Sequence, residues 1–134
     1  MKDSHKLVVD TNILFMALTN PVGKLALLLD IANQDKIELF SSESVRKEII
    51  RVLKRETGLA EEKINKIIAG LPINWISKES YSPFLNKTKV KHKADKPIEA
   101  LVIALECKII TADKKFAKAL GKRAADIDEL LEKF

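Results

Sequence analysis

Short apolar runs alternate with helical segments along this chain, and this order constrains the fold more than any other feature. Residues 7–9, 36–40 and 108–111 have the length and apolar pattern of strands, and residues 73–76 form a third strand in chain order or an extended link. Strands that are separated by helices pair in parallel through crossover connections. The sequence therefore predicts an α/β fold with a small parallel sheet.

The helical segments between these runs carry apolar residues at helical spacing. We expect helices over the following segments: 13–18, 22–33, 42–57, 60–69, 94–107, 113–120 and 127–134. Ser41 or Ser42 begins the third helix and Gly58 ends it, while Pro97 lies in the first turn of the fifth. Residues 81–93 are the least regular part of the chain. We expect one domain over residues 1–134.

Composition excludes several classes of site. The single cysteine, Cys107, allows no intrachain disulfide, and only His5 and His92 could join it in a zinc site. The four glycines are scattered, so no dinucleotide or phosphate-binding glycine loop is present. No apolar run approaches the roughly 20 residues that span a bilayer, and the first residues do not resemble a signal peptide. We expect a cytoplasmic protein without a membrane partner, and the net charge of +5 suits a polyanion.

Four acidic residues occupy comparable places near the ends of the predicted strands. Asp10 follows the first strand and Asp113 follows the last, while Asp95 begins the helix that leads into the last strand. Glu48 lies two turns into the helix after the second strand. Ligands of open α/β sheets bind outside the carboxyl ends of the strands. These carboxylates could therefore converge on one edge of the sheet.

Each acid also has a purely structural interpretation. Asp10, Asp95 and Asp113 could be helix N-caps, and Glu48 could pair with Arg51 one turn later. Taken together, four carboxylates at one edge would repel one another unless protons or cations neutralised them. Mg²⁺ and Mn²⁺ prefer oxygen ligands, so a divalent-cation site is the metal chemistry that these residues favour.

Several ordered segments resemble the PIN domain family. The similarity covers residues 8–14 (VVDTNIL) and 41–53 (SSESVRKEIIRVL), then 95–106 (DKPIEALVIALE) and 109–116 (IITADKKF). The resemblance implies a three-layer αβα sandwich, Rossmann-like, that uses Mg²⁺ or Mn²⁺ to hydrolyse RNA. Members similar to VapC toxins pair with an antitoxin and are usually homodimers, so we expect both here, or else a stand-alone RNA-processing enzyme.

The same resemblance assigns roles to individual residues. Asp10, Glu48, Asp95 and Asp113 match the catalytic and metal-binding acids of the family, and Glu99 could replace or supplement Asp95. Supporting polar positions are Thr11, Asn12 and Thr111. Lys115 stands where many members carry another Asp or Asn.

Two lysine-rich segments flank the predicted acidic site. Lys89, Lys91 and Lys93 precede Asp95, and Lys114 and Lys115 follow Asp113. Lysines that neutralise phosphates release counterions, so these segments are candidates for RNA binding, although they would also suit a solvated face. Two other functions fit the sequence: an RNA-binding or assembly module that cleaves weakly or not at all, and a phosphoacceptor signalling domain. The second usually pairs two acids near its first strand, and Asp10 has no acidic neighbour.

Overall fold

A computed structural model of the chain describes residues 5–134, and a parallel sheet forms its centre. The strands are β1 (Lys6–Val9), β2 (Glu38–Ser42), β3 (Ile73–Ile76) and β4 (Lys108–Ile110), in the spatial order β3-β2-β1-β4. All three strand pairs are parallel. The segment 73–76 is therefore a strand and not a link. The second strand begins two residues later than predicted, because the backbone of Lys36 still bonds back to Ile31 at the end of the preceding helix.

The helices follow the predicted order with small shifts at their ends. Between β1 and β3 lie α1 (Thr11–Thr19), α2 (Lys24–Asn33), α3 (Glu43–Thr57) and α4 (Glu61–Ala69). Between β3 and β4 lie α5 (Lys78–Tyr81), η2 (Ser82–Lys87), η3 (Lys93–Asp95) and α6 (Lys96–Leu105). After β4 come α7 (Lys114–Leu120), η4 (Gly121–Arg123) and α8 (Ile127–Leu131).

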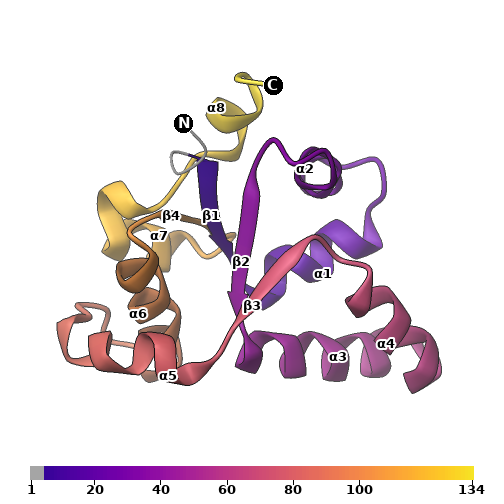
Figure 1. The fold of residues 1–134 in the computed structure, drawn as a ribbon, viewed down its shortest axis with the longest axis horizontal. Coiled ribbons are helices and arrows are strands. Elements are labelled where there is room, and N and C mark those ends of the chain that lie inside the picture. Colours follow the sequence, from indigo (N-terminus) through magenta and orange to yellow (C-terminus); the bar gives the residue numbers. More distant parts are fainter. Residues whose placement is uncertain (1–4) are drawn as a thin grey trace.

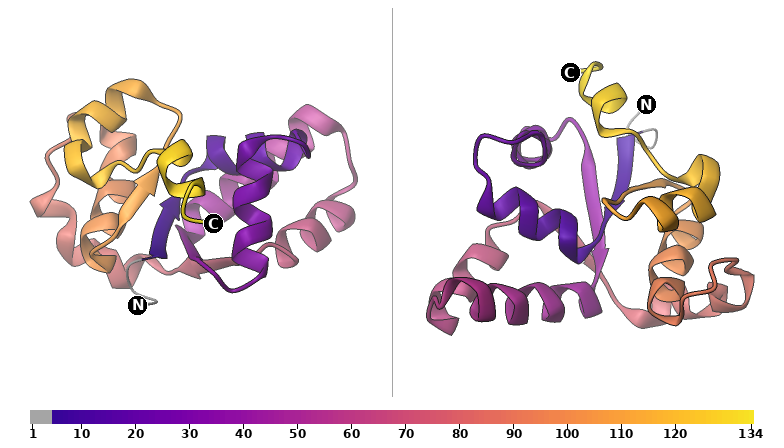
Figure 2. Two further views of the ribbon diagram at one scale, coloured as in Figure 1. Left: turned by 90° about the horizontal axis from the view of Figure 1, so that it is seen from above. Right: turned by 180° about the vertical axis from the view of Figure 1, so that it is seen from behind.

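Alternating strand residues divide the core into two halves, one on each face of the sheet. Leu7, Val9 and Leu39 pack in a cluster with α1–α4, whereas Val8 and Phe40 pack on the other face with α6 and α7. Figures 1 and 2 show the two groups of helices on opposite sides of the sheet. Successive side chains of a strand point to opposite faces, so both faces of this sheet are buried. The three-layer αβα sandwich is confirmed.

The strand order creates one place where the chain changes direction across the sheet. The connections from β1 to β2 and from β2 to β3 run outward in one direction, and the connection from β3 then returns to β4 on the far side of β1. Neighbouring strands β1 and β4 thus lead into helices on different faces, α1 and α7. Such a switch point leaves a crevice at the carboxyl ends of the strands.

Local signals explain where α3 begins and ends. Of the two candidate serines, Ser42 is the N-cap, because its hydroxyl accepts a hydrogen bond from the Val45 amide at 3.1 Å. Gly58 ends the helix with a φ of +69°, a left-handed conformation that glycine adopts without steric cost. The apolar stripe of this helix is buried core: Val45, Ile49 and Leu53.

The structure also settles several aromatic and apolar positions. Tyr81 is only 2% exposed and belongs to the core, so it is not available to stack on a base. Within residues 5–134, no single helix has the length and apolar character needed to cross a bilayer, and α1 with α2 meets that test only as a pair bent by 96°.

Candidate active site at the switch point

Asp10 lies directly after β1 and has defined partners for both carboxylate oxygens. It is 8% exposed. Oδ1 accepts a hydrogen bond from the Ile13 amide at 3.0 Å, which confirms the N-cap interpretation for α1. Oδ2 accepts from the Thr111 hydroxyl at 2.9 Å. This second contact joins residues that are 101 positions apart and ties the end of β1 to the end of β4.

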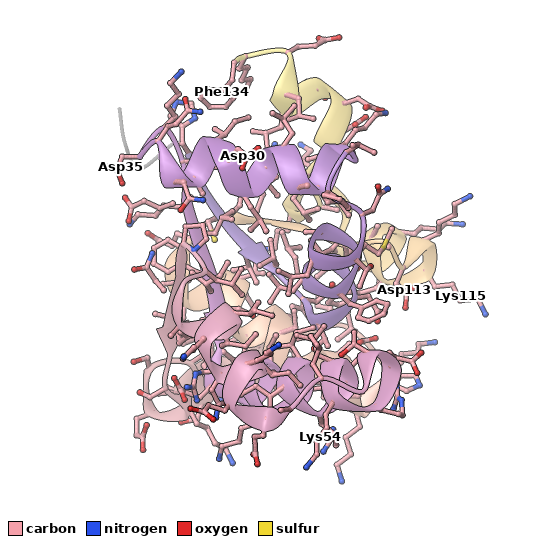
Figure 3. The ribbon with its side chains drawn as sticks, turned by 90° about the vertical axis from the view of Figure 1, so that its right-hand side faces the viewer. Asp30, Asp35, Lys54, Asp113, Lys115 and Phe134 are labelled. Carbon is pink, nitrogen blue, oxygen red and sulfur yellow. The ribbon has the colours of Figure 1, made fainter. Side chains whose placement is uncertain are left out.

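Asp113 lies at the start of α7, two residues after Thr111. Its Oδ1 accepts from the Phe116 amide at 3.1 Å, so the N-cap interpretation is confirmed here too. Its own amide donates to the Thr111 hydroxyl at 3.2 Å. Thr111 therefore stands between the two acids and contacts both residues. Figure 3 shows Asp113 and Lys115 on the same side of the molecule, at its surface.

Glu48 reaches the same edge of the sheet from α3. Its Oε1 accepts a hydrogen bond from the hydroxyl of Thr11, the residue after Asp10. Its Oε2 lies 3.9 Å from the Arg51 guanidinium, so the predicted pair one helical turn apart is confirmed. An exposed pair of this kind contributes little to stability. The Thr11 contact is the one that places Glu48 beside Asp10.

Asp95 differs from the other two aspartates because it caps no helix. Its side chain makes no capping hydrogen bond to α6, and its backbone is helical (φ −86°, ψ −17°) where a cap would be extended. The N-cap interpretation of Asp95 is therefore wrong. The 3₁₀ turn η3 runs straight into α6, so no extended cap position separates them.

Burial and a neighbouring negative charge raise the pKa of two of these acids, Asp10 and Asp95. Burial raises the pKa of Asp10, hydrogen bonds from Ile13 and Thr111 oppose that rise, and the negative charge of Asp113 adds to it. Partial burial also raises the pKa of Asp95, with a further rise from Asp113 and an opposing effect of His92. The negative charge of Asp113 thus contributes to the raised pKa of both Asp10 and Asp95.

Other residues singled out in the sequence have varied places. Asn12 is exposed in the first turn of α1, and Thr11 is buried beside it. Glu99 is buried, with Oε1 bonded to the amides of Lys89 and Val90 and Oε2 facing Arg123. All of its oxygens therefore have protein partners, in contrast to Asp95.

The donor set fits a hard divalent cation in its chemistry. Aspartate and glutamate supply only oxygen ligands here, and repulsion among them would be relieved by a positive charge. In the described part of the chain, residues 5–134, no group of three Asp, Glu, His or Cys side chains is placed so that it could hold a metal ion. Asp10, Asp113, Glu48 and Asp95 are the residues whose carboxylate oxygens such an ion would use.

Sequence reasoning missed one polar contact that shapes this edge. Ser41 is 1% exposed, and its hydroxyl donates to the Val9 carbonyl at 2.7 Å. This bond fixes the end of β2 against the last residue of β1, directly before Asp10. The available signal was the pair of serines at the end of a strand, of which only one can cap the helix that follows.

Fold and site together define a class: an α/β domain with an acidic cluster at the carboxyl edge of a parallel sheet. The sequence profile of the PIN domain matches residues 8–131. The chain belongs to the PIN domain family. PIN domains are generally nucleases, and they generally use divalent metal ions.

A solved structure shares the fold. It is a chain of the VapBC2 complex from Rickettsia felis, bound to a DNA fragment from their promoter, and it has a TM-score of 0.62 at 15% identity. The alignment covers 89% of this chain and 95% of that one. No curated protein sequence matches the chain.

Proposed function

We propose that this protein is a metal-dependent endoribonuclease whose active site is the acidic crevice between β1 and β4. One observation supports the proposal above the others. The Thr111 hydroxyl contacts both Asp10 and the Asp113 amide, while Thr11 holds Glu48 on the other side of Asp10. Acids from distant parts of the chain are thus gathered where ligands of such sheets bind.

In this proposal, different residues of the site bind the cation and orient its ligands. Asp10 is oriented by two hydrogen bonds and would be the central ligand, with Asp113 opposite. Asp95 and Glu48 would complete the site directly or through water. When bound, Mg²⁺ or Mn²⁺ supplies Lewis-acid stabilisation of the charge that develops on the phosphoryl group. Thr11 and Thr111 orient the carboxylates, and Asn12 offers an exposed amide beside them.

Lysines near the acids would attract the RNA backbone. Lys89, Lys91 and Lys93 are exposed on the segment before Asp95, and Lys114 and Lys115 are exposed just after Asp113. An acidic crevice alone repels RNA, so cationic residues on both sides would hold the phosphates over it. Each neutralised phosphate on a single strand lowers the slope of log K against log salt by about 0.7.

Cleavage of a mixed RNA pool tests the proposal. The wild-type protein should cut RNA with Mg²⁺ or Mn²⁺, stop with EDTA, and recover when the metal is restored. Asp113→Asn should lose at least about 99% of the activity, since ligand loss typically removes metal-dependent chemistry. Asp30→Asn is the matched control, because Asp30 is exposed on α2 and lies away from Asp113 in Figure 3.

Three results would count against this function. Cleavage that persists in EDTA, or full activity of Asp113→Asn, would remove the acidic crevice from the chemistry. RNA binding without any cleavage under either metal would favour the alternative of a PIN-fold binding module. The slope of log K for RNA binding against log salt would then still measure how many phosphates the lysines neutralise.

The proposal includes two protein partners, an antitoxin and a second copy of the chain. Resemblance to VapC-like toxins supports both. The apolar stripes of α3 and α4 supply core, with Ile64 and Ile68 fully buried, but Leu59 and Ile67 remain 37% exposed. Light scattering of the purified protein would measure the dimer, and co-purification with the product of an adjacent reading frame would reveal the antitoxin. A monomeric protein in solution would contradict the dimer. Failure to bind the product of the adjacent reading frame would contradict the antitoxin.

A further inference from the structure

Glu99 is a buried carboxylate with three donors around it. Its side chain is 2% exposed, although it sits on α6 among apolar neighbours such as Ala100 and Leu101. Oε1 accepts from the Lys89 amide at 2.7 Å and from the Val90 amide at 3.0 Å. Such a charge would be costly to bury without these donors. These hydrogen bonds therefore compensate for burying the Glu99 carboxylate.

The segment that Glu99 binds carries two of the lysines that precede Asp95, Lys89 and Lys91. Residues 88–92 are neither helix nor strand, so no ladder of backbone bonds holds them. Val90 is 3% exposed and points into the core, whereas Lys89 and Lys91 on either side are exposed. This alternation presents the lysines on one side of an extended stretch. The two amide bonds to Glu99 lie at the centre of that stretch.

The second oxygen of Glu99 connects the segment to the end of the chain. Oε2 lies 3.6 Å from the Arg123 guanidinium, which belongs to η4. Helix α7 ends directly before η4 and begins at the lysine pair Lys114 and Lys115. One carboxylate thus links the segment of Lys89 and Val90 to η4, the turn that follows α7.

We propose that Glu99 is a positioning residue for RNA: it fixes the backbone at Lys89 and Val90 and so holds the lysine row, Lys89 and Lys91, in place on the segment that leads to Asp95. The inference rests on the proposed function for its RNA part. Pre-organised donors bind a polyanion without first paying the conformational entropy of ordering a loop. The role differs from metal ligation, because Glu99 acts through the backbone amides of Lys89 and Val90, to which it is hydrogen-bonded.

Hydrogen exchange tests the tether without any RNA. In the wild-type protein the amides of Lys89 and Val90 should exchange slowly for an irregular segment. Glu99→Ala should accelerate both by at least roughly tenfold, as expected when a local hydrogen bond is lost. Trypsin should also cut after Lys89 and Lys91 sooner in this variant. Unchanged exchange of both amides in a folded Glu99→Ala protein would overturn the proposal.

RNA affinity against salt tests the positioning role. With Lys89 and Lys91 released, up to two phosphate contacts weaken, and the slope of log K against log salt should become shallower by up to about 1.4 for a single strand. The KM for RNA should rise more than kcat falls. A residue that only stabilised the core would lower the melting temperature and leave the salt slope unchanged. That combination would reject the positioning role.

Two further variants keep the test decisive. Glu99→Gln retains an oxygen acceptor for the two amides but loses the charge that faces Arg123, so it serves if Glu99→Ala does not fold. It should show an intermediate change in exchange and in slope. Glu106→Gln is the matched control, because Glu106 is exposed at the end of the same helix and the change removes the same charge. An equal effect of the control on the slope would refute a specific role for Glu99.

The two proposals can fail separately. If the wild-type protein neither binds nor cuts RNA, the proposed function and the RNA part of this inference both fail, while the exchange of Lys89 and Val90 still decides whether Glu99 holds the segment. If the wild-type protein cuts RNA but Glu99→Ala keeps its exchange rates and salt slope, only the inference about Glu99 fails.

Discussion

Asp10 combines two opposing contributions to stability, and substitution can separate them. The carboxylate caps α1 and accepts from Thr111, which stabilises the fold. Its charge is also buried near Asp113, which raises its pKa above the ordinary value of 3.8. Asp10→Asn keeps the side-chain shape and the oxygen that caps α1 but removes the charge. Asp10→Ala removes the side-chain shape, the capping oxygen and the charge. The two variants should therefore differ in stability although both lose the acid.

The size of that difference follows from the hydrogen bonds that each substitution removes. Loss of an N-cap typically costs about 1 kcal/mol, and asparagine caps about as well as aspartate. The Thr111 hydroxyl can turn to accept from an asparagine amide, whereas alanine leaves it without that partner, at a cost of about 1 kcal/mol at most. Asp10→Asn should therefore be about 1–2 kcal/mol more stable than Asp10→Ala. For a chain of 134 residues each kcal/mol corresponds to about 4 °C in melting temperature.

The pH dependence gives the sign of the charge effect. Because the pKa of Asp10 is raised in the folded state, the folded protein binds more protons than the unfolded chain between pH 3.8 and the raised value. The contribution of Asp10 to the unfolding free energy must fall as pH rises through this window and stay low above it. Asp10→Asn lacks this fall, so its stability relative to wild type should increase from pH 4 to neutral pH.

Thermal unfolding from pH 3.5 to pH 8, without divalent ions, measures both effects. Asp126 supplies a matched pair of controls, because it caps α8 at an exposed position and accepts from Asp128 and Glu129 amides. Its Asn and Ala variants should show the cap contribution alone. The reasoning fails if Asp10→Ala is as stable as Asp10→Asn, or if wild type and Asp10→Asn keep a constant difference across this pH range.

Two further outcomes follow from neighbouring residues. Thr111→Val removes the hydrogen bond that lowers the pKa of Asp10, so the acidic limb of the pH–rate profile should move to higher pH and activity should fall by roughly 10- to 100-fold. Thr111→Ser keeps the hydroxyl and should restore both the pH–rate profile and the activity. An acidic limb that does not move in Thr111→Val would contradict this role of Thr111. Burial raises the pKa of the Cys107 thiol to about 11. Iodoacetamide at pH 8 should therefore label the native protein far more slowly than the unfolded chain, and Cys107→Ala should retain RNA cleavage; rapid native labelling would contradict the burial.

Local pattern was enough to predict most of the architecture. The continuous apolar run at 7–9 predicts a buried strand, and the core clusters on either side of the sheet agree. Cap residues also act locally, so Asp10, Ser42 and Asp113 could be proposed as helix starts from their neighbours alone. Each of these depends on interactions within a few positions of the chain.

The acidic cluster was predictable only in part. That acids follow β1 and β4 can be read from the chain, but which strands are neighbours depends on the sheet order. The contacts of Thr111 with Asp10, and of Thr11 with Glu48, join positions 101 and 37 residues apart. No local pattern specifies such pairs, because a hydroxyl at either position could equally face solvent.

Asp95 and Glu99 mark the boundary between what the sequence and the tertiary structure each determine. The sequence places both acids one helical turn apart at the start of a helix, and that spacing alone makes them interchangeable candidates. Folding separates their roles: packing of residues 88–92 against α6 buries Glu99 under two amides and Arg123, while the 3₁₀ turn before α6 leaves Asp95 without a capping bond. The sequence determines that a carboxylate is present at each position. The tertiary structure determines its partners, because the fold decides which backbone and side-chain donors come within about 3 Å of it.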